Sequence, residues 1–399
     1  MPSVQVRALS GRVLWGPKDL DITISCAKLK EDVLTSLGER FPAPVQLLVE
    51  DMLLPEHGRL ETVLPFEKYP QMAIELTLVV KPQAHKPSEP LPGLYVSELN
   101  NHRVTRWLNA SAEIVMGGFG RGSERSQLAG PRSIVSGANG AIYIAEIGNQ
   151  RVSEWSLQGR GLAQYVKTIA ENTPACSLEE PGAICVDNDG QLYVADSKAH
   201  AVSCWIEENT RIEGRIVAGG KGPGDDLDQL NRPTGVAIDD DGTLYIAEFG
   251  NDRVTRWAPG AKMGEVVAGG NGWGDDLDQL AGPVALSLQG SSKPRTKKPH
   301  DTAFAILVCE LGNNRISRWW PGERRCEVLV GHGTLPELMG PQEIFYNDED
   351  GSIFVSEAGS SRVTCWKPGA HYGQVVAGGN GRGDNLDQVN GPFGVLLLR

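Results

Sequence analysis

One short phrase recurs along the chain and constrains its fold more than any other feature. Each copy runs from a β-rich stretch through a polar turn into a second β-rich stretch, as in IAEFGNDRVTRW at residues 246–257, and each ends in tryptophan. The six tryptophans are Trp107, Trp155, Trp205, Trp257, Trp319 and Trp366, with separations of 48, 50, 52, 62 and 47 residues. A period near 50 residues is typical of a four-stranded propeller blade and too long for most helical repeats.

The repeat at residues 232–280 shows how one blade is built. Its β-rich stretches are GVAID, TLYIA, RVTRW and GEVVAGG, and turns rich in Asp, Asn, Pro and Gly separate them. Val254 and Trp257 lie three residues apart, so their side chains point to opposite faces of the third strand. Apolar groups on both faces suit a sheet that packs between two other sheets. We therefore interpret the six tryptophans as core between blades rather than as a ligand cage.

The two ends of the repeat array complement each other. The first repeat starts with PGLYVSE at residue 92 and lacks an innermost strand, while the final GPFGVLLLR at residues 391–399 has the pattern of that strand. Pairing between them would close the ring and remove the exposed edges that make open sheets aggregate. The sequence thus predicts a mainly β, six-bladed propeller over residues 92–399, closed by residues 391–399.

The repeated phrase resembles the NHL repeat. Five copies place an acidic residue five positions before an arginine, as in IAEIGNQRV and IAEFGNDRV, and the resemblance extends over residues 92–399. It implies a six-bladed propeller that works by binding. Some NHL-repeat proteins act in ubiquitin ligases, where a RING domain carries the chemistry, and this sequence shows no paired Cys and His ligands at RING spacing. Any role in ubiquitination would therefore be that of an adaptor.

Residues 1–81 have a different pattern, with the order ββαββ. Leu29, Val33 and Leu37 recur every four residues and predict a helix over residues 26–41. With QLLVEDMLLPEHGRLETV, the segment resembles ubiquitin-like domains of the α+β (β-grasp) class. It lacks a terminal Gly-Gly after LTLVV, so the resemblance implies a domain that is not conjugated.

In that resemblance, the apolar recognition patch of ubiquitin corresponds to Leu9, Leu48 and Thr77. The threonine weakens the patch, and a spacer or dimerisation domain is the alternative interpretation. Residues 82–91, PQAHKPSEPL, are a proline-rich stretch that we interpret as an extended linker.

Overall charge and composition narrow the expected partners. The net charge is −12, which argues against DNA and disfavours RNA, because nucleic-acid binding needs a basic surface. We see no apolar run long enough for a signal peptide or a membrane span. Seven cysteines lie scattered without metal-ligand spacing, so we expect reduced thiols, no metal or cofactor, and a cytoplasmic protein, with the nucleus as the alternative. A protein partner is the main expectation.

Several repeated residues suggest chemistry but have structural interpretations. The acidic residues are Glu98, Glu146, Asp196, Glu248, Glu310 and Glu357, followed five positions later by Arg103, Arg151, Ala201, Arg253, Arg315 and Arg362. A ring of carboxylates could hold a cation, yet sixfold repetition favours an ion pair that orients the turn. The GDDLDQL runs at 224–230 and 274–280 could suggest calcium, but we interpret them as connections between blades whose aspartates cap local N–H groups.

Signs of catalysis are few, and we predict no catalytic residue. His102 and His200 occupy equivalent turns, and we expect them to be solvated. No nucleophile elbow occurs. An enzyme of the six-bladed hydrolase or lyase group, with a metal in the channel, is the alternative function.

One insertion breaks the symmetry of the repeats. The fifth unit carries QGSSKPRTKKPHD at residues 289–301, with the basic residues Lys293, Arg295, Lys297 and Lys298. This segment is either a solvated loop or a docking site for an acidic partner, phosphate or RNA. The leading hypothesis is a non-catalytic protein-interaction scaffold or adaptor. RNA binding through arginine-rich turns and this loop is a further alternative.

Overall fold

The computed structural model divides the chain into two compact units, Met1–Ser88 and Glu89–Arg399. In the first 91 residues it describes the backbone of five strands. From residue 92 to 398 it describes the chain except for residues 109–110, 138–139, 158–162, 175, 209–210, 291–303, 332–333 and 335.

The N-terminal unit contains one mixed sheet. Its strands are β1 (Ser3–Arg7), β2 (Val13–Asp19), β3 (Val45–Val49), β4 (Met52–Leu53) and β5 (Ile74–Val80), in the spatial order β2-β1-β5-β3-β4. Strands β1 and β5 pair in parallel, and the other pairs are antiparallel. The predicted helix 26–41, residue Leu9 and the linker 82–91 lie outside the described residues, as do the side chains of Leu48 and Thr77. The ubiquitin-like assignment therefore stays a prediction.

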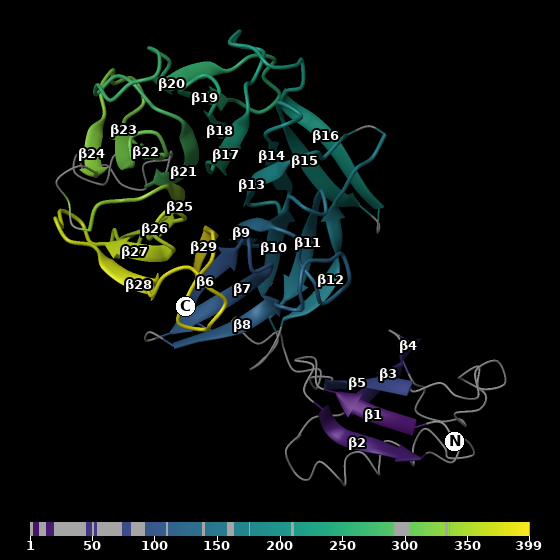
Figure 1. Cartoon of the computed structure of the whole chain (residues 1–399). Helices are drawn as coiled ribbons and strands as arrows, with labels where there is room; N and C mark the ends of the chain where they lie inside the picture. The colour runs from purple at the N-terminus through teal and green to yellow at the C-terminus, as the bar shows by residue number, and fades with distance from the viewer. Residues whose placement is uncertain are drawn as a thin grey trace. The chain divides into compact units, whose positions relative to one another are not determined.

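The second unit consists of six four-stranded antiparallel sheets arranged as a ring (Figure 1), so the predicted six-bladed propeller is confirmed. The first blade has β29 (Pro392–Leu398), β6 (Gly93–Glu98), β7 (Arg103–Leu108) and β8 (Ser111–Gly117). The second has β9 (Pro131–Ser136), β10 (Ala141–Glu146), β11 (Arg151–Ser156) and β12 (Gln164–Ala170). The third has β13 (Pro181–Val186), β14 (Leu192–Asp196), β15 (Ala201–Glu208) and β16 (Arg211–Gly219).

The remaining three blades follow the same order from the centre outward. The fourth has β17 (Pro233–Ile238), β18 (Leu244–Glu248), β19 (Arg253–Trp257) and β20 (Glu265–Gly269). The fifth has β21 (Pro283–Gln289), β22 (Ala305–Glu310), β23 (Arg315–Trp319) and β24 (Glu327–Val330). The sixth has β25 (Pro341–Tyr346), β26 (Ile353–Glu357), β27 (Arg362–Trp366) and β28 (Gln374–Gly378).

The first blade is assembled from both ends of the unit. Strand β29 pairs antiparallel with β6, with Pro392 opposite Glu98 and Leu398 opposite Gly93. In each of the other five blades the inner strand directly precedes the second strand in the sequence, whereas the first blade takes its inner strand, β29, from the other end of the unit. Without β29 the inner edge of β6 would be unpaired. The last residues of the chain thus complete the ring.

The six repeat tryptophans are all buried, and each packs in the core between adjacent blades. Trp155 of the second blade clusters with Tyr95 and Val104 of the first, and Trp319 of the fifth with Tyr245 and Val254 of the fourth. Each indole N–H also donates to the hydroxyl two residues earlier, at 2.8–3.1 Å. Burial and a satisfied N–H together explain why tryptophan recurs at this place.

Strand direction divides the loops between two faces of the propeller. Because neighbouring strands are antiparallel, the turns between second and third strands lie at the same end as the connections from one blade to the next. We call this end the connection face. The turns between first and second and between third and fourth strands lie at the other end, which we call the turn face.

Candidate functional site

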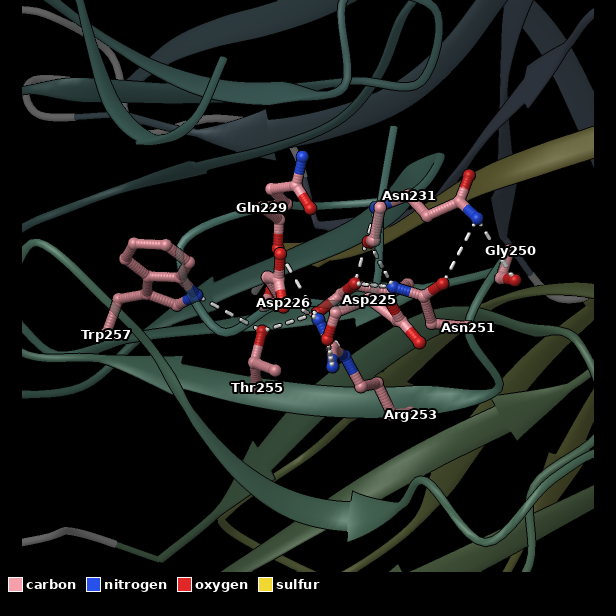
Figure 2. Close-up of polar contacts among 11 residues, drawn as sticks. Asp225, Asp226, Gln229, Asn231, Gly250, Asn251, Arg253, Thr255 and Trp257 are labelled. Carbon is pink, nitrogen blue, oxygen red and sulfur yellow. Dashed lines mark hydrogen bonds and ion pairs between the residues drawn. The ribbon is translucent and has the colours of Figure 1, made fainter. Parts of the chain in front are cut away.

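The repeated acidic residue and arginine form an internal clamp, shown for the fourth blade in Figure 2. Glu248 ends β18 and Arg253 begins β19, and the Arg253 Nε donates to Glu248 Oε1 at 2.9 Å. Thr255 donates to the same oxygen at 2.9 Å and accepts from the indole N–H of Trp257 at 3.1 Å. Both charged side chains are more than nine-tenths buried. The pair therefore joins the turn to the tryptophan core.

The clamp also holds the connection that arrives from the preceding blade. Arg253 donates to the carbonyl oxygens of Asp225 at 2.6 Å and Asp226 at 3.3 Å, and Asn251 donates to the Gly224 carbonyl at 2.8 Å (Figure 2). The sequence predicts that aspartate side chains cap this connection. In the structure, the carbonyl oxygens of Asp225 and Asp226 accept the bonds that fix it.

Four other blades repeat the clamp. The pairs are Arg103–Glu98, Arg151–Glu146, Arg315–Glu310 and Arg362–Glu357, with nitrogen–oxygen distances of 2.8–2.9 Å. Arginine, hydroxyl and amide donors occupy these carboxyl oxygens, which favours the ion-pair interpretation over a ring that holds a cation. The arginines are largely buried, so these turns do not present them to RNA.

The third blade keeps the acidic residue and dispenses with the arginine. Ala201 replaces the arginine, and Asp196 accepts bonds from backbone N–H groups instead. The donors are Glu179 at 2.6 Å, Glu180 at 3.0 Å, Lys198 at 3.1 Å and Ala199 at 2.9 Å. The carboxylate of this shorter acidic residue is therefore stabilised by backbone N–H donors, as the glutamates of the other blades are by arginine.

The two turn histidines are partly exposed and also take part in contacts between blades. His102 and His200 have φ values of 51° and 52°, and each Nδ1 accepts a backbone N–H from the next blade. The donors are Gly130 at 3.0 Å and Arg232 at 3.1 Å. Asp252 and Asn314 accept the equivalent bonds in two other blades, both at 2.8 Å. The left-handed turn residue therefore latches each of these blades to the following one.

The inner strands carry one residue that breaks the symmetry of the channel. The third position of each inner strand is Ser133, Ala183, Gly235, Ala285, Glu343 or Gly394. Small residues suit this position because a Cβ on Gly235 would lie 2.9 Å from the Cα of Ala285, and one on Gly394 would lie 2.4 Å from the Arg132 carbonyl oxygen. Only the sixth blade places a long polar side chain there.

Glu343 lines a cavity of about 310 Å³ inside the ring of inner strands. Residues of all six inner strands line it, including Ile134, Val236, Leu286 and Phe345, and its wall is polar and apolar in similar amounts. At the end nearer the connection face the channel narrows between residues that include Arg132, Thr234, Gln342, Glu343 and Phe393.

The Glu343 carboxyl group lies in an environment that disfavours its charge. Burial raises its pKa to about 7, and the backbone N–H of Ile344, at 3.2 Å from Oε1, and the charge of Arg132 offset only part of that rise. Arg132 itself lies 3.7 Å from a Glu180 carboxyl oxygen, and its guanidinium lies 4.9 Å from the centre of the Phe393 ring. Burial lowers the pKa of Arg132.

Sequence reasoning missed Glu343, although the sequence contained a signal. The inner strands begin GPRS, EPGA, RPTG, GPVA, GPQE and GPFG, and aligning them on proline shows one acid among small residues. The tryptophan phrase lies in another part of the repeat and carries no information about this position.

The connection face carries an exposed tryptophan that sequence reasoning also missed. Trp273 is 68% exposed on the connection that leaves the fourth blade, where Arg121, Pro223 and Arg382 occupy equivalent positions. Asp275 and Asp276 follow it and are exposed as well. An exposed aromatic side chain beside charges distinguishes this surface from the buried repeat tryptophans.

Other predicted sites stay untested. Lys293, Arg295, Lys297 and Lys298 lie outside the described residues, between the ends of β21 and β22. Within the described residues, no three His, Cys, Asp or Glu side chains gather as a metal site. The described residues include no helix that is long and apolar enough to cross a membrane.

The comparisons with known proteins agree with this architecture. The family model described as NHL repeat matches residues 178–205 and 230–257, in the third and fourth blades. NHL repeats are thus recognised in these two blades. The match to residues 178–205 includes Ala201, so this NHL repeat is recognised without its arginine.

Solved structures resemble this chain at low sequence identity. A crystal structure of a nidogen/laminin complex aligns with a TM-score of 0.52 and 14% identity, over 76% of this chain and 97% of that chain. A catalytically inactive virginiamycin B lyase from Staphylococcus aureus with quinupristin aligns with a TM-score of 0.42 and 15% identity, over 71% and 81%. The first likeness shows the fold alone.

Proposed function

We propose that this NHL-repeat propeller is a non-catalytic protein-interaction scaffold or adaptor that binds its partner on the connection face. The observation that carries the proposal is Trp273, which is 68% exposed on a connection with a fixed backbone. Large exposed aromatic side chains are frequent anchors of protein interfaces, because they bury much apolar area at low entropic cost.

The connection that carries Trp273 is held in place from the fifth blade. Arg315 donates to the carbonyl oxygens of Asp275 at 2.6 Å, Asp276 at 3.3 Å and Gln279 at 3.0 Å. Asn313 donates to the Gly274 carbonyl at 2.8 Å. A surface ordered before binding loses less conformational entropy when a partner docks, which favours affinity.

The charges around Trp273 indicate the chemistry of the partner. Asp225, Asp226, Asp275 and Asp276 are exposed on two successive connections, and their carbonyl oxygens, not their side chains, accept the clamp bonds. The chain as a whole carries a net charge of −12. A lysine- or arginine-rich segment would meet complementary charge here, and a cation can also stack on the indole face.

The proposal extends to the N-terminal unit as a ubiquitin-like domain that offers a second contact. Five strands in the order β2-β1-β5-β3-β4, with β1 and β5 parallel, support this assignment. Leu9, Leu48 and Thr77 would form its recognition patch. Replacing Leu48 with Ala should leave partner binding by the propeller unchanged and weaken only contacts that need residues 1–81. Equal partner sets with and without residues 1–81 would show that the unit is passive.

The test compares two exposed aromatic residues on opposite faces. Trp273→Ala is compared with the control Tyr372→Ala, because Tyr372 is 72% exposed in the turn between β27 and β28 on the turn face. Binding of fluorescent lysine-rich, neutral and acidic peptides to the full chain is measured by anisotropy. We expect preferential binding of basic peptides, weakened by at least about 10-fold in Trp273→Ala, which corresponds to loss of one interface anchor.

Two results would contradict the proposal. Equal binding of basic and acidic peptides would contradict the charge complementarity. An equal loss of affinity in both variants would contradict binding on the connection face. Affinity capture followed by mass spectrometry then identifies natural partners, which should be lost from Trp273→Ala and kept by Tyr372→Ala.

A further inference from the structure

The packing of the channel does not explain why Glu343 is an acid. Five of the six equivalent positions are glycine, alanine or serine, and close approach of neighbouring inner strands requires small side chains at Gly235 and Gly394. A carboxyl group here costs desolvation energy that the other five blades avoid. Such a departure from symmetry marks a site with its own chemistry.

The hydrogen bonds of Glu343 leave half of its carboxyl group unused. Oε1 accepts the backbone N–H of Ile344 at 3.2 Å, and Oε2 accepts no hydrogen bond from the described residues. In the clamp, by contrast, Glu248 Oε1 accepts from Arg253 and Thr255, and Oε2 accepts from Asn251 at 2.6 Å. The described residues also provide no cation in ion-pair contact with Glu343, since Arg132 pairs with Glu180.

The space beside this carboxyl group fits a small organic molecule. At about 310 Å³ the cavity lies at the lower end of the range for ligand sites, and its walls present polar and apolar surface in similar amounts. Glu343 is the one acidic side chain among the described residues that line it, while Ser136 and Ser287 add hydroxyl groups. Arg132 lines the narrow end rather than this cavity.

From this geometry we propose that the channel binds a small organic amine with an apolar body. The ammonium group donates to Glu343 Oε2, and the body packs on the apolar part of the wall, which includes the half-buried Phe345. A charge-assisted bond offsets the cost of partly desolvating both charged groups, since Glu343 is half-buried. This site is independent of partner binding on the connection face.

The surroundings of Glu343 define the pH dependence of such binding. Arg132 on β9 and Cys309 on β22 interact with it directly, and Glu310 on β22 and Glu357 on β26 lie near Cys309. The flanking strands β21 and β29 carry no ionisable side chain. Burial raises the pKa of the Cys309 thiol well above its usual range, so it stays protonated below pH 8. Arginines hold the carboxyl groups of Glu310 and Glu357 in the clamps.

Only ionised Glu343 can attract the ammonium group. With a pKa of about 7, the ionised fraction rises about tenfold between pH 6 and pH 8, while an alkylamine stays protonated at both values. Apparent affinity for the amine should therefore rise about tenfold over this range. A neutral ligand of the same size should show no such rise.

The experiment is calorimetric titration of the full chain with n-butylamine and with n-butanol, at pH 6 and pH 8. A ligand of this size bound efficiently has a Kd of about 0.1–10 mM. We expect saturable butylamine binding that is about tenfold tighter at pH 8. Glu343→Gln should weaken it at pH 8 by at least about tenfold and remove the pH dependence, whereas exposed Glu323→Gln should behave as wild type.

Three outcomes would overturn the proposal. They are no saturable binding of butylamine at pH 8, equal affinity for butylamine and butanol at both pH values, and unchanged binding by Glu343→Gln. The comparison of the two ligands and two pH values needs only the wild-type chain, so the proposal stays testable even when Glu343→Gln folds poorly.

Discussion

Two kinds of carboxyl group lie within one propeller, and their surroundings differ. The acidic residues that end the second strands accept bonds from arginine, hydroxyl and amide groups, as Glu248 does. Glu343, on an inner strand, accepts one backbone bond within the described residues. The first kind is part of the framework, and the second is available to a ligand. Number of donors, rather than burial alone, separates the two roles.

The third blade shows what the framework requires. Asp196 has four backbone N–H donors where the other blades provide arginine, and the blade keeps its strands and its buried Trp205. The requirement is therefore a satisfied carboxyl group at the end of the second strand, and arginine is one way to meet it. This explains how Ala201 occurs in an otherwise regular repeat.

Removing an arginine from the clamp should have the largest effect. In Arg253→Ala, Glu248 stays buried and loses its cation, which should lower the free energy of unfolding by about 3–5 kcal/mol. Urea denaturation followed by circular dichroism measures this change. Arg256→Ala is the control on the same strand, because its pair with Glu265 is exposed and should contribute less than about 1 kcal/mol. Equal losses in both variants would contradict the distinction between the clamp and a surface pair.

The substitute clamp of the third blade should be the next most sensitive. Asp196→Asn keeps the shape but replaces a charged acceptor of four N–H groups with an amide that accepts through one oxygen. We expect a loss of about 1–3 kcal/mol in the free energy of unfolding. Asp189→Asn, at an exposed position in the same blade, should change it by less than about 0.5 kcal/mol. If Asp196→Asn were as stable as wild type, the turn would not need a charged acceptor at this position.

Glu343 should affect stability in the opposite direction. Its pKa rises from 4.5 to about 7 on folding, so the folded state binds more protons between these values and stability falls as pH rises through them. Glu343→Gln removes this penalty and should be about 1–3 kcal/mol more stable than wild type at pH 8, with little difference at pH 4.5. Urea denaturation at both pH values tests it. A variant less stable than wild type at pH 8 would assign Glu343 to the framework.

The sequence predicts the repeated parts of this molecule far better than its exceptions. Six copies of the tryptophan phrase are enough to predict six blades, because local strand and turn preferences agree in every copy. Glu343 and the latches formed by His102 and His200 depend on contacts between blades. Linear spacing does not show which inner strands approach closely or which turn reaches the next blade. Aligned inner strands show that Glu343 is unusual, but its contacts and those of the two histidines needed the three-dimensional arrangement.

The smallest predicted effect concerns the latch at His102. Its Nδ1 accepts the Gly130 N–H only while the ring is neutral, and burial, assisted by the charge of Arg121, lowers the His102 pKa. The unfolded chain then binds more protons below its ordinary pKa of 6.5, so stability falls as pH drops from there through the folded pKa. His102→Asn supplies a neutral acceptor, as Asn314 does in the fifth blade, and should reduce the loss between pH 7 and pH 5 by about 0.5–1 kcal/mol. Thermal denaturation at the two pH values measures this, with exposed His371→Asn as the control that should not alter the pH dependence. An identical pH dependence in wild type and His102→Asn would mean that the turn keeps its contact with the second blade without the imidazole.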